Sequence, residues 1–204
     1  MRLTFKKTAT FALMLVIFLT WLAPIWPYEQ ALHCSLTVLG LGVLAWFERC
    51  YPMSNFDFAL VMVFFVIHSI AAHWLYSNVP YDVWFQAVFG QGLNEIMGWT
   101  RNHFDRLVHF CYGFCFAPAI IGYAKIKGAT RRKTAWLIAI CAIMVTSLWY
   151  EWFEWLIAAT LSPSDAEAYN GQQGDMWDAH KDMLSATIGA LIWFFPRQFP
   201  RNFK

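Results

Sequence analysis

An acidic stretch, QGDMWDAHKDM, runs from Gln173 to Met183 in a chain in which only 14% of residues are charged. Asp175, Asp178 and Asp182 are three and four positions apart, so a helix would align their carboxylates in one stripe. His180 lies between the last two of them. Carboxylates and imidazoles in this pattern are suited to holding a metal ion or to moving a proton.

Two pairs of ionisable residues lie in hydrophobic segments of the chain. Asp105 and His109 are four positions apart, and Glu151 and Glu154 are three positions apart. Each pair therefore shares one face of a helix. Ionisable groups are costly in a membrane interior, where they face the centre of a helix bundle and mark functional positions. We therefore expect both pairs to face the interior of the protein, towards the acidic stretch.

Two histidines, His68 and His73, lie in another hydrophobic segment. Their separation of five positions places them about 140° apart around a helix, so they do not both point at one centre. The order of the hydrophobic segments places His73 at the depth of the acidic residues and His68 deeper. We expect His73 to join the cluster and His68 to form its floor.

The combination of these residues predicts a metal site. Carboxylates and imidazoles from facing helices build the di-metal sites of helix bundles, and mixed donors of this kind suit Zn, Fe or Mn. Such a divalent metal would activate water for hydrolysis, or oxygen for oxidation. The candidate ligands come from all of these sets: His68, His73, Asp105, His109, Asp175, Asp178 and His180. The candidate catalytic residues are carboxylates, of which one would be the general base: Glu151, Glu154 and Asp182.

Two other interpretations account for the same residues. A proton- or ion-coupled transporter would use Asp, Glu and His side chains as a relay. In a structural interpretation, Arg101 and Arg106 pair with Glu151, Glu154 or Asp105 and only hold the helices in register. The sequence contains no HExxH, ExxH or HxxxH pattern, so the metal interpretation lacks an established signature. The sequence also lacks two similar halves, which argues against the repeat architecture of many transporters.

The composition indicates which elements position these residues. The 204-residue chain is 59% hydrophobic, whereas soluble domains are typically about 45–50% apolar and about 25% charged. A helix needs about 20 mostly apolar residues to cross a bilayer. We therefore predict an all-α, polytopic membrane helix bundle that forms a single domain over residues 1–204. Its six hydrophobic segments are approximately 9–26, 31–47, 58–76, 104–124, 134–160 and 181–196.

Smaller features refine this architecture. Gly113, Ala186 and Gly189 are typical of close contacts between helices. The segment 79–102 is apolar but interrupted by Gly and charged residues, which predicts a short interfacial helix or a lid over the site.

The five cysteines form no CxxC pattern and predict no disulfide framework. The expected partners are the lipid bilayer and a lipid or small-molecule ligand. A net charge of +2 does not favour nucleic acid as a partner.

Basic residues predict the orientation, because Lys and Arg accumulate on the cytoplasmic side of membrane proteins. Basic residues flank the hydrophobic segments mainly at the two termini and between the fourth and fifth segments. They are Arg2, Lys6, Lys7, Lys125, Lys127, Arg131, Arg132, Lys133, Arg197, Arg201 and Lys204. Six spans bring these three regions to one side. We therefore expect both termini in the cytoplasm and the ionisable cluster on the periplasmic side.

Four motifs, in this order, resemble the YjdF-type inner membrane protein family of bacteria. They are HSIAAHWLYSNVP at 68–80, DRLVHFCYGF at 105–114, EWFEW at 151–155 and QGDMWDAHKDM at 173–183. The resemblance covers essentially the whole chain, and the fourth motif is its most specific part. It implies a multi-pass protein of the bacterial inner membrane. The family has no assigned activity, so the resemblance does not decide between the enzyme, transporter and structural interpretations.

Overall fold

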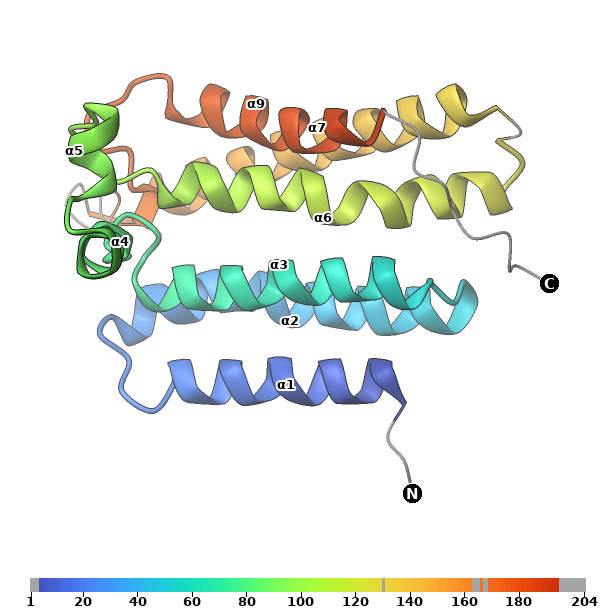
Figure 1. Cartoon of the computed structure of the whole chain (residues 1–204), viewed down its shortest axis with the longest axis horizontal. Coiled ribbons are helices and arrows are strands. Elements are labelled where there is room, and N and C mark those ends of the chain that lie inside the picture. The colour runs from blue at the N-terminus through green and yellow to red at the C-terminus, as the bar shows by residue number, and fades with distance from the viewer. Residues whose placement is uncertain (1–3, 130, 163–165, 167–168, 195–204) are drawn as a thin grey trace.

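The computed structural model describes residues 4–129, 131–162, 166 and 169–194, and all regular structure within these ranges is helical (Figure 1). The prediction of an all-α fold is therefore confirmed. In chain order the helices are α1 (Phe5–Thr20), α2 (Pro27–Cys50), α3 (Asn55–His73), α4 (Tyr81–Phe89), α5 (Leu93–Met97), α6 (Phe104–Ile126), α7 (Arg132–Ala158), α9 (Asp178–Leu191) and the short 3₁₀ helix η1 (Ile192–Phe194).

Each predicted hydrophobic segment coincides with one long helix, although the ends differ. The first segment was expected to extend to residue 26, but α1 ends at Thr20 and α2 begins at Pro27. Proline lacks a backbone N–H and is favoured in the first turn of a helix, which explains this start. Helix α3 begins at Asn55 because the Ser54 hydroxyl accepts a hydrogen bond from the backbone N–H of Asp57, at 3.1 Å. Residues 195 and 196 of the last segment lie outside the described residues.

Four of the long helices are long and apolar enough to cross a membrane, namely α2, α3, α6 and α7. Helix α1 has 16 residues and α9 has 14. At 1.5 Å per residue they are about 24 and 21 Å long, shorter than the ~30 Å hydrocarbon core of a bilayer. The structure thus shows four candidate spans within its described residues, and the predicted count of six stays a prediction.

The long helices run side by side, with α6 at the centre of the bundle (Figure 1). Helix α6 packs against α9, α7 and α3, and α3 packs in turn against α1, whereas α2 packs mainly against α3. Small buried residues form much of the core shared by α6, α7 and α9, among them Ala117, Ala139, Ala186 and Ala190. Small side chains allow helices to approach closely, as is typical of membrane bundles.

Helices α6 and α9 approach each other closely. A Cβ atom added to Gly113 would lie 1.8 Å from the carbonyl oxygen of Ala186, and one added to Gly189 would lie 2.2 Å from the carbonyl oxygen of Phe110. Only glycine fits at these two positions without moving a backbone. The prediction that Gly113, Ala186 and Gly189 form a helix contact is therefore confirmed, and this contact holds the middle of α6 against the C-terminal half of α9.

The two ends of the bundle differ in character. One end carries the connection between α6 and α7 and the beginning of α1, where the basic residues Lys6, Lys125, Lys127 and Arg131 lie (Figure 1). The other end carries α4, α5 and the connection that leads into α9. The basic tail residues Arg197, Arg201 and Lys204, and Arg2 at the N-terminus, lie outside the described residues. We call these two ends the basic end and the acidic end.

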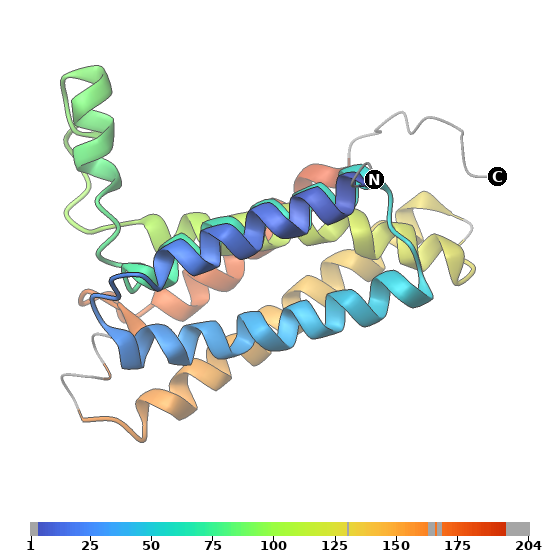
Figure 2. The same cartoon turned by 90° about the horizontal axis from the view of Figure 1, so that it is seen from below.

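The segment 79–102 forms α4 and α5, which project away from the bundle at its acidic end (Figure 2). Neither helix has a buried residue. Apolar side chains such as Val83, Val88 and Phe89 are more than half exposed. The backbone N–H of Asn94 donates to Asp82 Oδ1 at 2.7 Å, which joins the two helices. This exposed apolar surface is compatible with the predicted interfacial helix.

Candidate functional site

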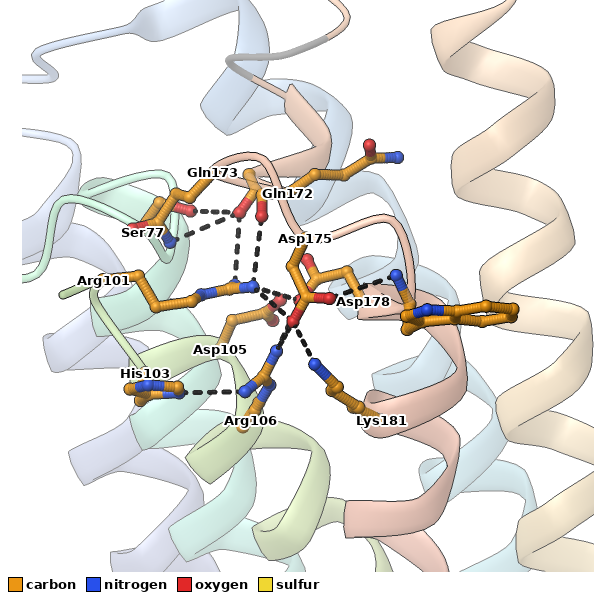
Figure 3. Close-up of polar contacts among 12 residues, drawn as sticks. Ser77, Arg101, His103, Asp105, Arg106, Gln172, Gln173, Asp175, Asp178 and Lys181 are labelled. Carbon is orange, nitrogen blue, oxygen red and sulfur yellow. Dashed lines mark hydrogen bonds and ion pairs between the residues drawn. The ribbon is translucent and has the colours of Figure 1, made fainter. Parts of the chain in front are cut away.

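Two arginines organise the acidic stretch at the acidic end of the bundle (Figure 3). Arg101 Nη1 lies 2.6 Å from Asp178 Oδ1, and Arg106 Nη2 lies 2.5 Å from Asp175 Oδ2. Each arginine also reaches the other aspartate, at 3.4 and 3.1 Å. Lys181 Nζ adds a third cation 2.6 Å from Asp175 Oδ2. Asp175 and Asp178 therefore belong to a charge-paired network of five residues, which we call the arginine network.

Hydrogen bonds tie the arginine network to neighbouring connections of the chain. Arg101 Nη1 donates to the carbonyl oxygen of Gln172 at 3.1 Å. The backbone N–H of Asn102 donates to Gln173 Oε1 at 2.9 Å, and Gln173 Nε2 donates back to the carbonyl oxygen of Asn102 at 3.0 Å. The Ser77 hydroxyl donates to the carbonyl oxygen of Gly171. The network thus joins the connections that follow α3, precede α6 and precede α9 (Figure 3).

The electrostatics of Asp175 fit this structural role. Its hydrogen bond from Lys181, together with those from the Trp177 backbone N–H and from Arg106, holds the pKa of the carboxyl well below its usual range. The side chain therefore stays ionised and accepts hydrogen bonds at any physiological pH. Because its oxygens are already engaged with three side-chain cations and a backbone N–H, Asp175 has little remaining capacity to bind a metal ion.

A second group of residues lies deeper, where α6, α7 and α9 meet. One donor atom from each of Asp105, His109 and Asp182 lies within 4.8 Å of the other two. His109 Nε2 is 3.5 Å from Asp105 Oδ1, and His109 Nδ1 is 3.8 Å from Glu151 Oε1. The side chains are nearly buried, since Asp105, His109 and Asp182 are 8%, 7% and 3% exposed. We call Asp105, His109, Glu151 and Asp182 the inner cluster.

The inner cluster has more carboxylates than cations. In the part of the chain that the structure describes, none of Asp105, Glu151 and Asp182 forms a salt bridge with Lys or Arg. Asp182 Oδ1 and Glu151 Oε1 are buried and have no hydrogen-bond partner. Three buried carboxylates beside one imidazole are strongly unfavourable unless a cation or bound protons compensate them. The arrangement therefore requires a bound cation, bound protons or both.

The donor set fits a divalent metal ion. Two donors that each lie ~2.1 Å from one ion are at most about 4.2 Å apart, so small side-chain rotations would bring the three donors to one ion. Metal-bound histidines typically donate their second ring N–H to a carboxylate. If Nε2 of His109 binds the ion together with Asp105, then Nδ1 faces Glu151, which is well placed to accept that hydrogen bond.

A polar cavity of about 310 Å³ lies beside the inner cluster. Its lining includes Asp105, Glu151 and Asp182 from the cluster, together with Glu154 and His180. His180 is exposed and its ring contacts that of Trp177, at 5.4 Å between centroids. No residue of segment 79–102 lines this cavity. Glu154 and His180 thus border the polar cavity but lie outside the three-donor group.

Asp175, Asp178 and His73 are three of the predicted ligands that lie outside the inner cluster. Asp175 and Asp178 bind the arginines instead. His73 Nδ1 lies 2.9 Å from the carbonyl oxygen of Thr20 and connects the end of α3 to the end of α1. The expectation that His73 joins the cluster is therefore corrected. Its physical reason is the early end of α1, which leaves the Thr20 carbonyl outside the helix ladder, where both His73 and Gln30 Nε2 reach it.

His68 and the two arginines also have partners other than those predicted from the sequence. His68 Nδ1 is 2.5 Å from the Tyr76 hydroxyl, and its Nε2 has no partner. The structural interpretation expected Arg101 and Arg106 to pair with Asp105 or the glutamates. That pairing is wrong, because both arginines bind Asp175, in the connection before α9, and Asp178, the first residue of α9. These partners could not be predicted from the sequence, because they are brought together by chain segments that are far apart in sequence.

Sequence reasoning missed a buried histidine on α2. His33 is 2% exposed, and neither ring nitrogen has a hydrogen-bond partner. Its ring stacks on Tyr169 at 4.5 Å and contacts Tyr76 at 4.8 Å. The sequence contained a signal that could have identified His33, because it is an ionisable residue within a hydrophobic segment.

Comparison with known proteins supports the resemblance seen in the four motifs. Residues 5–197 match a protein-family model described as "Predicted membrane protein (DUF2238)". The "Inner membrane protein YjdF" of Escherichia coli (strain K12) is 28% identical over 176 residues, which cover 85% of this chain and 75% of that protein. No solved structure matches the chain significantly.

Proposed function

The chain thus belongs to the DUF2238 family of membrane proteins, and from that premise we propose that it is a multi-pass inner-membrane protein that binds a divalent metal ion through Asp105, His109 and Asp182. We further propose that it acts on a lipid or another membrane-embedded substrate. The observation that carries the proposal is the inner cluster, in which buried carboxylate oxygens of Asp182 and Glu151 have no partner beside a single imidazole.

The chemistry follows from the positions of the side chains. Asp105, His109 and Asp182 hold the ion, and Glu151 orients the His109 ring from its opposite nitrogen. A divalent ion supplies Lewis-acid activation of water or of a substrate oxygen. Glu154 borders the same cavity and is available as the general base that accepts a proton. The ion would be Zn, Fe or Mn, which suit mixed imidazole and carboxylate donors.

Elemental analysis of the purified protein tests the metal proposal. After purification in mild detergent without chelators, we expect about one Zn, Fe or Mn ion per chain, because a buried site with three donors retains its ion. A content below about 0.2 ion per chain, which allows for partial loss, would contradict the proposal. In that case protons must compensate the inner cluster, as in the transporter or structural interpretations.

We propose six spans, with the basic end of the bundle in the cytoplasm. Helices α1 and α9 lie alongside the four longer helices, which supports their crossing most of the bilayer (Figure 1). The accumulation of Lys and Arg at one end supports the orientation. Three exposed residues test both points: Met176 at the acidic end, Lys127 at the basic end, and Lys7 near the start of α1.

The test uses Met176→Cys, Lys127→Cys and Lys7→Cys, each compared with the unsubstituted chain. A membrane-impermeant maleimide added to intact spheroplasts should label the Met176→Cys variant alone. The other two variants should react only after permeabilisation. Labelling of Lys127→Cys in intact spheroplasts would reverse the orientation, and labelling of Lys7→Cys there would show that α1 does not cross the membrane.

A further inference from the structure

A second cavity, of about 480 Å³, lies between α2, α3, α6 and α7. Its volume falls within the ~300–1,000 Å³ that is typical of small-molecule sites. We call it the apolar groove, because most of its lining is aliphatic or aromatic, including Val43 and Phe47 from α2 and Phe116 from α6. Its α2 wall runs from Leu36 to Phe47, about 16 Å along the helix axis.

The apolar groove is open towards the surroundings of the bundle. Leu39 and Val43 line it, and their side chains are 63% and 54% exposed. Both residues belong to α2, which is one of the candidate spans. An opening beside a membrane-spanning helix faces lipid hydrocarbon, so an apolar chain can enter the groove from the bilayer without passing through water.

Polar atoms without partners lie in the wall of this otherwise apolar groove. Thr37 Oγ1, His68 Nε2 and Ser147 Oγ are buried and form no hydrogen bond within the described part of the chain. The three side chains are 5%, 6% and 1% exposed. A buried polar group without a partner is costly. The wall of the groove therefore contains three groups whose hydrogen bonds an occupant with hydrogen-bonding atoms would complete.

The apolar groove adjoins the proposed metal site. His109 lines the groove, and its Nδ1 lies 3.8 Å from Glu151, which lines the polar cavity. Thr37, His68, Ser147 and His109 all lie in the half of their helices nearer the acidic end. The remaining α2 wall, towards Phe47, is apolar. A molecule in the groove would thus have its polar part beside His109 and its apolar part directed towards the basic end.

We propose that the apolar groove binds one hydrocarbon chain of a membrane lipid, with the hydrogen-bonding atoms next to its head group held by Thr37, His68 and Ser147. This inference rests on the proposed function and deepens it, because it names the substrate class as a lipid whose polar part lies beside the inner cluster. Binding in the groove does not itself require the metal ion, so the two proposals can fail separately.

The test uses a lysophosphatidylcholine that carries a photoactivatable diazirine near the end of its single acyl chain. The full-length protein is reconstituted into phosphatidylcholine vesicles with this probe and irradiated, and labelled peptides are identified by mass spectrometry. We expect labelling to concentrate on the groove-facing residues of α2, α3 and α6. Labelling spread evenly over the lipid-facing surfaces of all the helices would overturn the proposal, since it would indicate bulk lipid only.

Two matched variants sharpen the result. Val43→Trp fills the groove and should reduce groove labelling about fivefold or more, as expected for overpacking of a site. Val38→Trp changes an exposed valine of the same helix that does not line the groove, and should leave labelling unchanged. Equal labelling of both variants would overturn the proposal. Their elution on size-exclusion chromatography verifies that both fold.

The polar wall and the metal are tested separately. Thr37→Val with Ser147→Ala should lower groove labelling about three- to tenfold or more, the value of one or two hydrogen bonds. An unchanged signal would show that only water satisfies these hydroxyls and would overturn the assignment of the polar wall. Groove labelling that persists in metal-free protein supports the groove even if the metal proposal fails. A metal-loaded protein without groove labelling refutes the groove proposal alone.

Discussion

Asp182→Asn is expected to reduce the bound divalent metal from about one ion per chain to below about 0.2, since the ion would lose one of its three protein donors. An amide is nearly the same size as a carboxylate but carries no charge. Asp182 Oδ1 is buried without a partner, so the substitution breaks no existing hydrogen bond at that atom. Elemental analysis and calorimetric titration with Zn²⁺ or Mn²⁺ measure the effect.

The matched control is Asp57→Asn. Asp57 is another nearly buried aspartate, 7% exposed, but it lies in the first turn of α3 at the basic end. It should leave the metal content unchanged. A similar loss in both variants would indicate a general effect of buried charge, and a full metal content in Asp182→Asn would exclude Asp182 as a ligand.

The thermal stability of the metal-free protein provides an independent test of the Asp182→Asn prediction. Removing an uncompensated buried carboxylate relieves an unfavourable charge, so the metal-free variant should melt at the same temperature as the metal-free parent or higher. Only the parent protein should gain stability when metal is added, by mass action. Stabilisation of both proteins by the same concentration of metal would place the ion elsewhere.

Gly113→Ala is expected to destabilise the protein severely and to lower its metal content at the same time. The added methyl group would lie 1.8 Å from the Ala186 carbonyl oxygen, which belongs to the backbone of α9 and cannot rotate away. The helices must therefore separate, at a cost typically of about 1–3 kcal/mol or more. Separation of α6 from α9 also moves Asp105 and His109 away from Asp182. The melting temperature in detergent and elemental analysis measure both effects.

Gly122→Ala is the control on the same helix. Apart from its chain neighbours and the backbone of its own helix, no heavy atom lies within 4 Å of the position where its Cβ would be added. Alanine favours a helix interior over glycine by up to about 1 kcal/mol, so this variant should be as stable as the parent or slightly more stable. If Gly113→Ala melted at the temperature of Gly122→Ala, the close approach of α6 and α9 would be refuted.

The sequence by itself determined the helices and the faces on which the ionisable residues lie. Hydrophobic segments of sufficient length predicted each long helix, because a backbone in an apolar environment must satisfy its hydrogen bonds internally. The four-residue spacing of Asp105 and His109 predicted that they share a face, since this relation is local to one helix. The small residues Gly113, Ala186 and Gly189 predicted the contact between the two helices that carry most of the inner cluster.

Only the tertiary structure decided which charges are paired. Arg101 and Arg106 are near Asp105 in sequence, yet they bind Asp175 and Asp178, because the starts of α6 and α9 and the connections before them meet at the acidic end. That meeting depends on the α6–α9 packing and the loop hydrogen bonds of Asn102 and Gln173. No local pattern encodes it.

The same pairing gives the acidic stretch two separate roles that its spacing alone could not distinguish. Asp175 and Asp178 face Lys and Arg side chains and join connections of the chain, whereas Asp182, one turn further along α9, faces Asp105 and His109 without a Lys or Arg partner among the described residues. A helical stripe aligns side chains but does not choose their partners. The partners come from other helices and connections, and they leave Asp182 Oδ1 buried without a hydrogen-bond partner.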